Sequence, residues 1–143
     1  MSSKYVIGYD GSAESARAVE FAIEQAKASG AAIIVAHVLE WSPYSFLTPE
    51  EIEERHARRK DELARAEKAV IEPLVKKLDA SGLKVETVIK YGNVTDILCS
   101  VAKDSGASQI FIGRTGGGIA ARVFGSVAGT LAQSAPVPCT IVP

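Results

Sequence analysis

The chain has 143 residues, of which 47% are hydrophobic and 23% are charged. This length and composition predict a single globular domain that folds without a disulfide or a structural metal. The formal net charge is −1, from 16 basic and 17 acidic residues. Such a balance argues against a nucleic-acid-binding protein, which usually carries a basic excess.

The sequence also lacks signals for export or membrane insertion. No apolar run approaches the roughly 20 residues of a membrane span, and the first residues lack the apolar core and cleavage site of a signal peptide. The two cysteines, Cys99 and Cys139, lie too far apart for a Cys-x-x-Cys motif. Two free, buried thiols in a reducing compartment are therefore favoured over a redox pair. We expect a soluble, cytoplasmic protein.

Five short segments predict β-strands. Four of them are apolar runs rich in β-branched residues, which is typical of strands buried on both faces: residues 5–9, 32–38, 109–112 and 140–142. The fifth segment, residues 84–89, alternates polar and apolar side chains, as an edge strand does.

Helical spacing of apolar residues fills the intervals between these strands. A helix from Ser12 or Ala13 to Ser29 is followed by Gly30 as a stop signal. A second helix follows Asn93, a predicted N-cap, and ends at Ser105 before a glycine.

The longest predicted helix covers residues 49–80 and begins with a dense run of charges. The charges form two i,i+4 pairs of the sign that supports an exposed helix, Glu51–Arg55 and Glu54–Arg58. We therefore expect a solvated helix face rather than a docking site. Pro73 is expected to kink this helix or to split it in two.

The alternation of strands and helices predicts an α/β fold with a doubly wound parallel sheet. Helices would cover both faces of this sheet. Sheets of this type bind ligands outside the carboxyl ends of their strands, where the winding reverses.

Two loops would meet at that reversal if the first and fourth strands are neighbours. Residues 9–12 follow the first strand, and the glycine-rich residues 113–118 follow the fourth. Gly125 and Ser126 open the last helix. Glycines let backbone N–H groups converge on a phosphate, and a helix start adds further donors and a positive dipole end. The segment therefore predicts a polyphosphate cradle, with a flexible loop and a serine N-cap as the alternative.

The sequence lacks the motifs of several other kinds of nucleotide-binding site. The chain contains no Gly-Lys-Ser/Thr of a P-loop, and no Gly-x-Gly-x-x-Gly follows the first strand. The first loop is also a poor match to the Ser-Gly-Gly-x-Asp-Ser loop of PP-loop ATP pyrophosphatases.

Three segments and one motif carry a resemblance to a known family. The segments are Val6–Ser12, Ala36-His37-Val38 and Pro136–Pro143. The motif is Gly113-x2-Gly116-x8-Gly125-Ser126, which is similar to Gly-x2-Gly-x9-Gly-Ser/Thr but is one residue shorter in the second gap. Over essentially its whole length, the chain resembles the universal stress protein family, and the motif resembles that of its ATP-binding branch.

The resemblance implies a five-stranded sheet of order 3-2-1-4-5 that binds ATP or a related adenine nucleotide (ADP or AMP), with Mg²⁺ as a possible companion. It also implies a homodimer formed through the C-terminal strand, residues 139–142. An apolar edge strand of this kind would otherwise remain open for pairing.

The base and the sugar would be bound from three strand ends, according to the resemblance. The implied residues are Gly8, Tyr9 and Asp10 on the adenine and ribose side, Val38 on the adenine face, and Ile112 and Gly113 over the base and sugar. Asp10 would accept hydrogen bonds from ribose hydroxyls or bind a metal ion through water. Its alternative role is a turn residue that caps the first helix, and the alternative for Val38 is a core valine.

The phosphates would be held by backbone N–H groups and one hydroxyl. The implied residues are Gly116, Gly125, Ser126 and Val127. Arg114 and Arg122 flank the loop and could pair with phosphate, with solvated surface arginines as the alternative.

Three other features of the sequence bear on function. His37 is interpreted as a core or loop-end histidine rather than a general base, and His56 as an exposed residue of the charged helix. Residues 41–46 mix polar and aromatic side chains. They could form a lid over a nucleotide or a surface for a partner, or they could simply pack on the flank of the domain.

We therefore predict a nucleotide-binding regulatory protein of the stress response that acts through dimerisation or an unknown protein partner. The chain offers no compact catalytic cluster, so we expect ATP hydrolysis to be weak or absent. Two alternatives stay open: a slow ATP hydrolase or nucleotidyl-transfer enzyme in which Asp10 holds Mg²⁺, and a nucleotide-free dimeric interaction protein.

Overall fold

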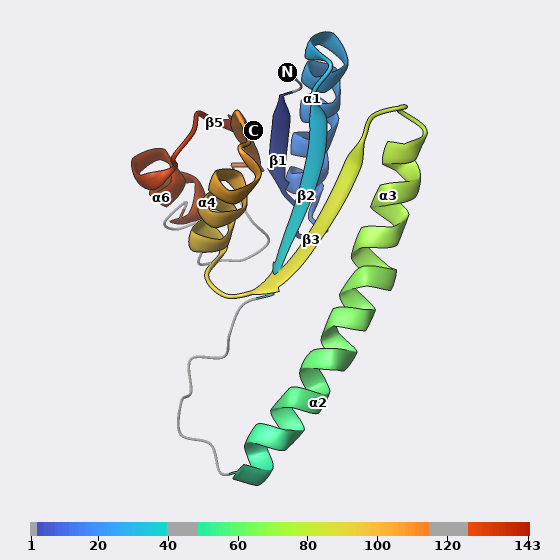
Figure 1. Ribbon diagram of the computed structural model, residues 1–143, viewed down its shortest axis with the longest axis vertical. Coiled ribbons are helices and arrows are strands. Elements are labelled where there is room, and N and C mark those ends of the chain that lie inside the picture. The colour runs from blue at the N-terminus through green and yellow to red at the C-terminus, as the bar shows by residue number, and fades with distance from the viewer. Residues whose placement is uncertain (1–2, 40–48, 115–125) are drawn as a thin grey trace.

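The computed structural model describes residues 3–39, 49–114 and 126–143, in which strands and helices alternate (Figure 1). The strands are β1 (Lys4–Gly8), β2 (Ala32–Leu39), β3 (Val85–Tyr91), β4 (Gln109–Gly113) and β5 (Cys139–Val142). The helical elements are α1 (Ala13–Ser29), α2 (Pro49–Ala66), the π-helical turn η1 (Glu67–Ile71), α3 (Glu72–Asp79), α4 (Val94–Ser105) and α6 (Ser126–Ser134). Each predicted strand lies within about two residues of an observed one.

The five strands form one sheet of order β3-β2-β1-β4-β5, and all four pairings are parallel. From β1 the chain adds β2 and β3 on one side, and it then crosses to the other side for β4 and β5. The winding therefore reverses between β1 and β4, which are direct neighbours. Both the predicted fold class and the predicted strand order are confirmed, and β3 is an edge strand as its alternation indicated.

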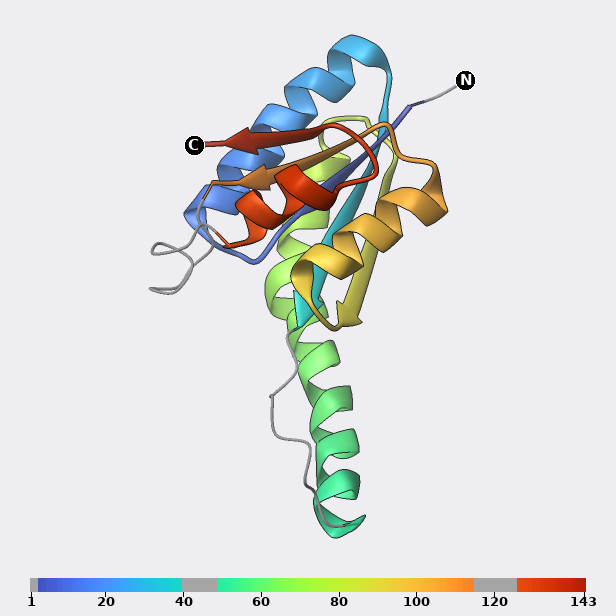
Figure 2. The same ribbon diagram turned by 90° about the vertical axis from the view of Figure 1, so that its left-hand side faces the viewer.

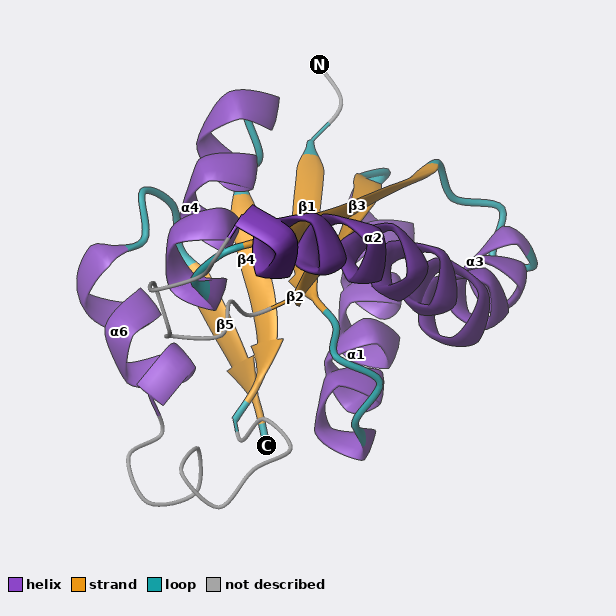
Figure 3. Ribbon diagram, turned by 90° about the horizontal axis from the view of Figure 1, so that it is seen from below, coloured by secondary structure: helices purple, strands orange, loops and turns teal. Residues whose placement is uncertain are grey.

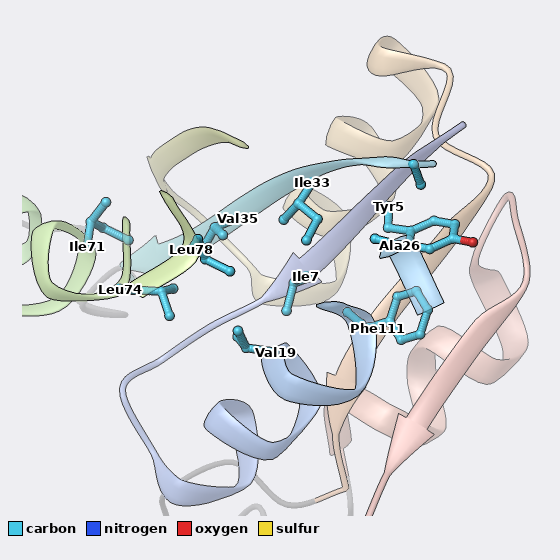
Figure 4. Close-up of a cluster of buried hydrophobic side chains, with 12 residues drawn as sticks. Tyr5, Ile7, Val19, Ala26, Ile33, Val35, Ile71, Leu74, Leu78 and Phe111 are labelled. Carbon is cyan, nitrogen blue, oxygen red and sulfur yellow. The ribbon is translucent and has the colours of Figure 1, made fainter. Parts of the chain in front are cut away.

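Two hydrophobic clusters hold helices to the two faces of the sheet (Figure 3). On one face, α1 and α3 pack on inward side chains that include Ile7, Ile33 and Phe111 (Figure 4). On the other face, Leu98 of α4 and Leu131 of α6 are fully buried against the sheet. Burying each such side chain contributes about 1.5–3 kcal/mol relative to leaving it exposed, so these clusters fix which helix lies on which face.

Helices α1 and α4 begin and end at the residues that the sequence indicated. The Ser12 side chain accepts a hydrogen bond from the N–H of Ser15 at the start of α1, and Asn93 does the same for Asp96 at the start of α4. Gly30 and Gly106 then end the two helices in the left-handed conformation, with φ of 75° and 69°.

The helical segment over residues 49–79 is divided by η1, directly before Pro73. A proline cannot donate a hydrogen bond to the carbonyl of Ala69, and its ring crowds that carbonyl. A single π-helical turn inside an α-helix changes the local hydrogen-bond pattern without ending the helix. The expected effect of Pro73 therefore takes the form of a π-helical turn between α2 and α3.

The exposed charged face of α2 is also confirmed. Arg58 and Glu54 form an i,i+4 ion pair at 3.4 Å, and both side chains are exposed. Exposed pairs of this kind contribute only about 0.3–0.5 kcal/mol. The other expected pair, Glu51–Arg55, lies outside what the structure describes, because the Arg55 side chain is not part of it.

Helix α2 projects beyond the end of the sheet (Figure 2). Side chains of this helix contact Tyr91 at the carboxyl end of β3. The Tyr91 hydroxyl donates a hydrogen bond to Glu62 Oε2, and the guanidinium of Arg59 lies 5.2 Å from the centre of the Tyr91 ring. Partial burial of the ring, the hydrogen bond to Glu62 and the charge of Glu62 raise the pKa of Tyr91 to about 12, against a smaller opposing effect of Arg59.

This raised pKa predicts a late tyrosine titration in the folded protein. The folded state keeps the Tyr91 proton above the ordinary pKa of 10.0, so the contact stabilises the fold below that pH and loses this effect as the pH rises towards about 12. The measurement is tyrosinate ultraviolet absorbance of the wild type minus that of Tyr91→Phe. Glu62→Gln should move the midpoint towards 10.0. A wild-type difference curve centred at the ordinary value would contradict the contact.

The two cysteines are free, as the sequence predicted, but they are half-buried rather than buried. Burial, and to a smaller extent the proximity of Cys99, raises the pKa of the Cys139 thiol. Among the residues that the structure describes, no helix is both long and apolar enough to span a bilayer.

Candidate functional site

The candidate site lies at the carboxyl edge of the sheet, where β1 and β4 end side by side. Register pairs Ile7 with Phe111, so Gly8 and Gly113 come at neighbouring strand ends. The loop that leads to α1 and the start of the glycine-rich segment leave the sheet there. This is the reversal point at which doubly wound sheets bind their ligands.

The loop after β1 is held to β2 by two hydrogen bonds of Tyr9. Its N–H donates to the carbonyl of Ala36 at 3.0 Å, and its carbonyl accepts from Nδ1 of His37 at 2.7 Å. A carbonyl only accepts, so Nδ1 carries the proton in this contact. His37 is 8% exposed, so it is a buried residue of β2 that also holds the neighbouring loop, in line with its interpretation as a core or loop-end histidine.

Asp10 is exposed, and its carboxylate is oriented by the start of α1. Oδ1 accepts hydrogen bonds from the N–H of Ser12 at 2.9 Å and from the hydroxyl of Ser15 at 2.8 Å. Asp10 is therefore a turn residue before α1, as the sequence offered in the alternative, whereas the N-cap of the helix is Ser12. The carboxylate nevertheless stays at the carboxyl edge, where an incoming ligand could meet it.

Close packing leaves little room for a side chain at Gly8 and none at Gly113. A Cβ on Gly8 would lie 3.1 Å from Ile112 and 3.2 Å from Leu98. A Cβ on Gly113 would lie 2.9 Å from the backbone carbon and oxygen of Glu14. The sequence predicted Gly8, Ile112 and Gly113 as ligand contacts, and the structure gives all three a packing role at that edge.

Three more predicted residues are described beside this edge. Val38 is half-buried at the carboxyl end of β2, and both its predicted role and the core alternative stay open. Arg114 is exposed, and its N–H donates to the carbonyl of Val142 at 2.9 Å. Val127, near the start of α6, packs against the cluster on the α4 side.

The predicted phosphate cradle lies largely outside the described residues. Gly116, Arg122 and Gly125 fall in the segment 115–125, and for Ser126 only its place at the start of α6 is described. Residues 41–46 and the side chain of His56 also lie outside the description. Their roles stay predictions.

The metal prediction likewise stays open. Within residues 3–39, 49–114 and 126–143, no group of three or more His, Cys, Asp or Glu residues could hold a metal ion. Asp10 alone remains the predicted indirect contact for Mg²⁺.

Ser15 is the residue that sequence reasoning missed. Its side chain is 5% exposed and forms hydrogen bonds with Asp10 and Ser12. No signal in the sequence indicated this role, because a second serine in the first helical turn has the same local pattern whether it is buried or exposed.

The fold and the site define a class of protein: a doubly wound α/β domain with a candidate ligand site at its topological switch point. A model of the Universal stress protein family matches residues 1–143. The chain therefore belongs to the universal stress protein family.

Solved structures of this family share the fold. The universal stress protein UspA from Lactobacillus plantarum has a TM-score of 0.82 at 21% identity, over 99% of this chain and 97% of that chain. A family member from Arabidopsis thaliana with AMP bound has a TM-score of 0.66 at 20% identity, over 98% and 90%. The universal stress protein from Archaeoglobus fulgidus in complex with dAMP has a TM-score of 0.63 at 24% identity, over 100% and 98%. No match was found among curated protein sequences.

Proposed function

We propose that residues 1–143 act as one regulatory domain that binds an adenine nucleotide, with ATP as the ligand, at the carboxyl edge of β1 and β4. One arrangement carries the proposal. Strands β1 and β4 end side by side at the switch point. Asp10, with an exposed carboxylate, follows β1, and the glycine-rich segment begins at Gly113, at the end of β4. The AMP and dAMP complexes of relatives support the ligand class.

The described residues fit the base and the sugar of such a ligand. Val38 offers half-buried apolar surface at the end of β2, and an ionised carboxylate such as Asp10 is an acceptor for ribose hydroxyls. The motif Gly113-x2-Gly116-x8-Gly125-Ser126 would supply backbone donors for the phosphates. Mg²⁺ would be bound by phosphate oxygens and, through water, by Asp10.

We also propose that the bound nucleotide acts through a homodimer formed at β5, or through a protein partner. β5 is an edge strand of the sheet, and its Ile141 side chain is 38% exposed. An open apolar edge is suited to pairing with a second copy. A nucleotide that binds one assembly state more tightly shifts the population towards that state.

The first test is a calorimetric titration of nucleotide-stripped protein with Mg²⁺-ATP. We expect saturable binding near one nucleotide per chain. The absence of heat and of competition at millimolar ATP would overturn the proposal and favour the nucleotide-free dimer. Sedimentation with and without ATP then tests whether occupancy changes the assembly state.

A pair of serine variants in α6 tests the phosphate motif. Ser126→Ala should weaken ATP binding about tenfold or more, because a hydrogen bond to a charged group contributes about 1.5–3 kcal/mol. Ser134→Ala is the matched control: this exposed hydroxyl at the other end of α6 donates to the carbonyl of Thr130. Equal affinities of the two variants would contradict the role of Ser126.

The same preparation tests slow hydrolysis. Steady release of phosphate or AMP that disappears in Asp10→Ala and in Ser126→Ala would favour the enzymatic alternative. Release that survives both changes would overturn this alternative.

A further inference from the structure

We propose that Ser15 is a positioning residue for nucleotide binding, which orients the Asp10 carboxylate towards the ribose. This inference rests on the proposed function, because it concerns how the same site recognises its ligand. It assigns a binding role to a buried residue of α1 that does not itself reach the carboxyl edge.

The geometry around Ser15 couples it directly to Asp10. The Ser15 hydroxyl donates to Asp10 Oδ1 at 2.8 Å, and the N–H of Asp10 donates to Ser15 Oγ at 3.3 Å. The carbonyl of Ser12 also lies within reach of this hydroxyl, at 3.0 Å. A hydroxyl has one proton, and the closer, charged carboxylate is the stronger acceptor.

The N-cap bond of α1 does not need this hydroxyl, although the Ser12 hydroxyl also donates to Ser15 Oγ at 3.1 Å. The N-cap of α1 is Ser12, whose Oγ accepts the N–H of Ser15 at 3.1 Å. That bond uses the backbone of Ser15, so an alanine at this position would preserve it. An alanine would also avoid burying a hydroxyl, which costs free energy unless the hydroxyl is hydrogen-bonded. The distinct effect of the Ser15 side chain is therefore on Asp10.

Two donors on a single oxygen fix the orientation of the Asp10 side chain. The N–H of Ser12 and the hydroxyl of Ser15 both approach Oδ1. An exposed side chain held in this way loses less conformational freedom when a ligand binds, which strengthens binding. The bond from His37 to the Tyr9 carbonyl restrains the preceding residue of the same loop.

The experiment compares two adenine nucleotides that differ in the sugar. AMP carries both ribose hydroxyls, and 2′,3′-dideoxy-AMP carries neither. Ser15→Ala should weaken AMP binding about three- to tenfold, because the Asp10 side chain is then no longer held in place before the ligand binds. The affinity for the dideoxy nucleotide should change less than twofold, because that ligand offers no hydroxyl to Asp10.

The matched control is Ser29→Ala at the opposite end of α1. Ser29 forms a partly buried hydrogen bond with the Tyr5 hydroxyl at 2.9 Å. Its loss should lower stability without changing the affinity for either nucleotide. A double variant adds a second readout: in an Asp10→Ala background, Ser15→Ala should have no further effect on AMP binding, since it acts through Asp10.

The outcomes separate this inference from the proposed function. Wild-type protein that binds neither nucleotide overturns the proposed function, and with it the role of Ser15. If wild-type protein binds AMP, two results overturn the positioning role alone: an unchanged AMP affinity in Ser15→Ala, or an equal loss for both nucleotides. An additional loss in the Asp10→Ala background would also overturn it.

Discussion

Replacing Phe111 with alanine is expected to lower the free energy of unfolding by about 3–5 kcal/mol, the range for deleting a large buried aromatic side chain. Phe111 is fully buried in β4. Its ring centre lies 5.1 Å from that of Tyr5 and 6.0 Å from that of Phe21. The variant loses both the buried apolar area and the ring contacts, and it leaves a cavity between α1 and the sheet. Urea unfolding followed by circular dichroism measures the effect.

Phe21→Ala is the matched control, because it removes the same side chain at the rim of the same cluster. Phe21 is 38% exposed, so water can fill the space that its ring leaves. We expect a loss of about 1 kcal/mol, as for substitutions outside fully buried positions. Equal losses for the two variants would contradict the placement of Phe111 at the centre of the core.

Replacing Gly113 with alanine is expected to lower the free energy of unfolding by about 1–3 kcal/mol through overpacking. The added Cβ would lie 2.9 Å from two backbone atoms of Glu14, and backbone cannot rotate aside as a flexible side chain can. Either β4 or the first turn of α1 must shift. Because that turn holds Asp10 through Ser15, the same variant should also weaken AMP binding.

Gly129→Ala provides the control for Gly113→Ala. Gly129 lies in α6, is exposed, and has nothing within 4 Å of an added Cβ. An alanine there should raise the free energy of unfolding by about 0.5–1 kcal/mol, through its higher helix propensity. If Gly113→Ala unfolded with the same midpoint urea concentration as the wild type, the close approach of β4 to α1 would be contradicted.

The glycines of the candidate site have a packing role that their sequence did not indicate. The family resemblance implied that the glycines at the ends of β1 and β4 contact the base and the sugar of a nucleotide. They also allow two elements to approach closely, which brings Asp10 and the start of the glycine-rich segment to one edge of the sheet. A change at either glycine should therefore affect both stability and binding.

The sequence predicted the elements of the fold because their signals are local. Apolar, β-branched runs indicated the buried strands, and the alternation of residues 84–89 indicated an edge strand. Serine and asparagine caps and glycine stops marked the ends of α1 and α4. The order of the five strands came from the family resemblance, and the structure confirms it.

The candidate site was predictable only in part. Its location followed from the rule that ligands bind where a doubly wound sheet reverses its winding. The turn role of Asp10 was foreseen as an alternative, whereas the burial of Ser15 and its bond to Asp10 were not. A serine in the first helical turn has the same local signal whether its hydroxyl faces water or a carboxylate.

By itself, the sequence determined the alternating architecture, the ends of its helices and the segments that could bind a phosphate. Each of these depends on residues within one or two turns of chain, or on one face of one element. Only the tertiary structure decided that Gly113 lies against Glu14, that Tyr91 contacts α2, and that His37 holds the carbonyl of Tyr9. These contacts join segments far apart in the chain. Their geometry depends on how the helices pack across the two faces of the sheet, which no local pattern records.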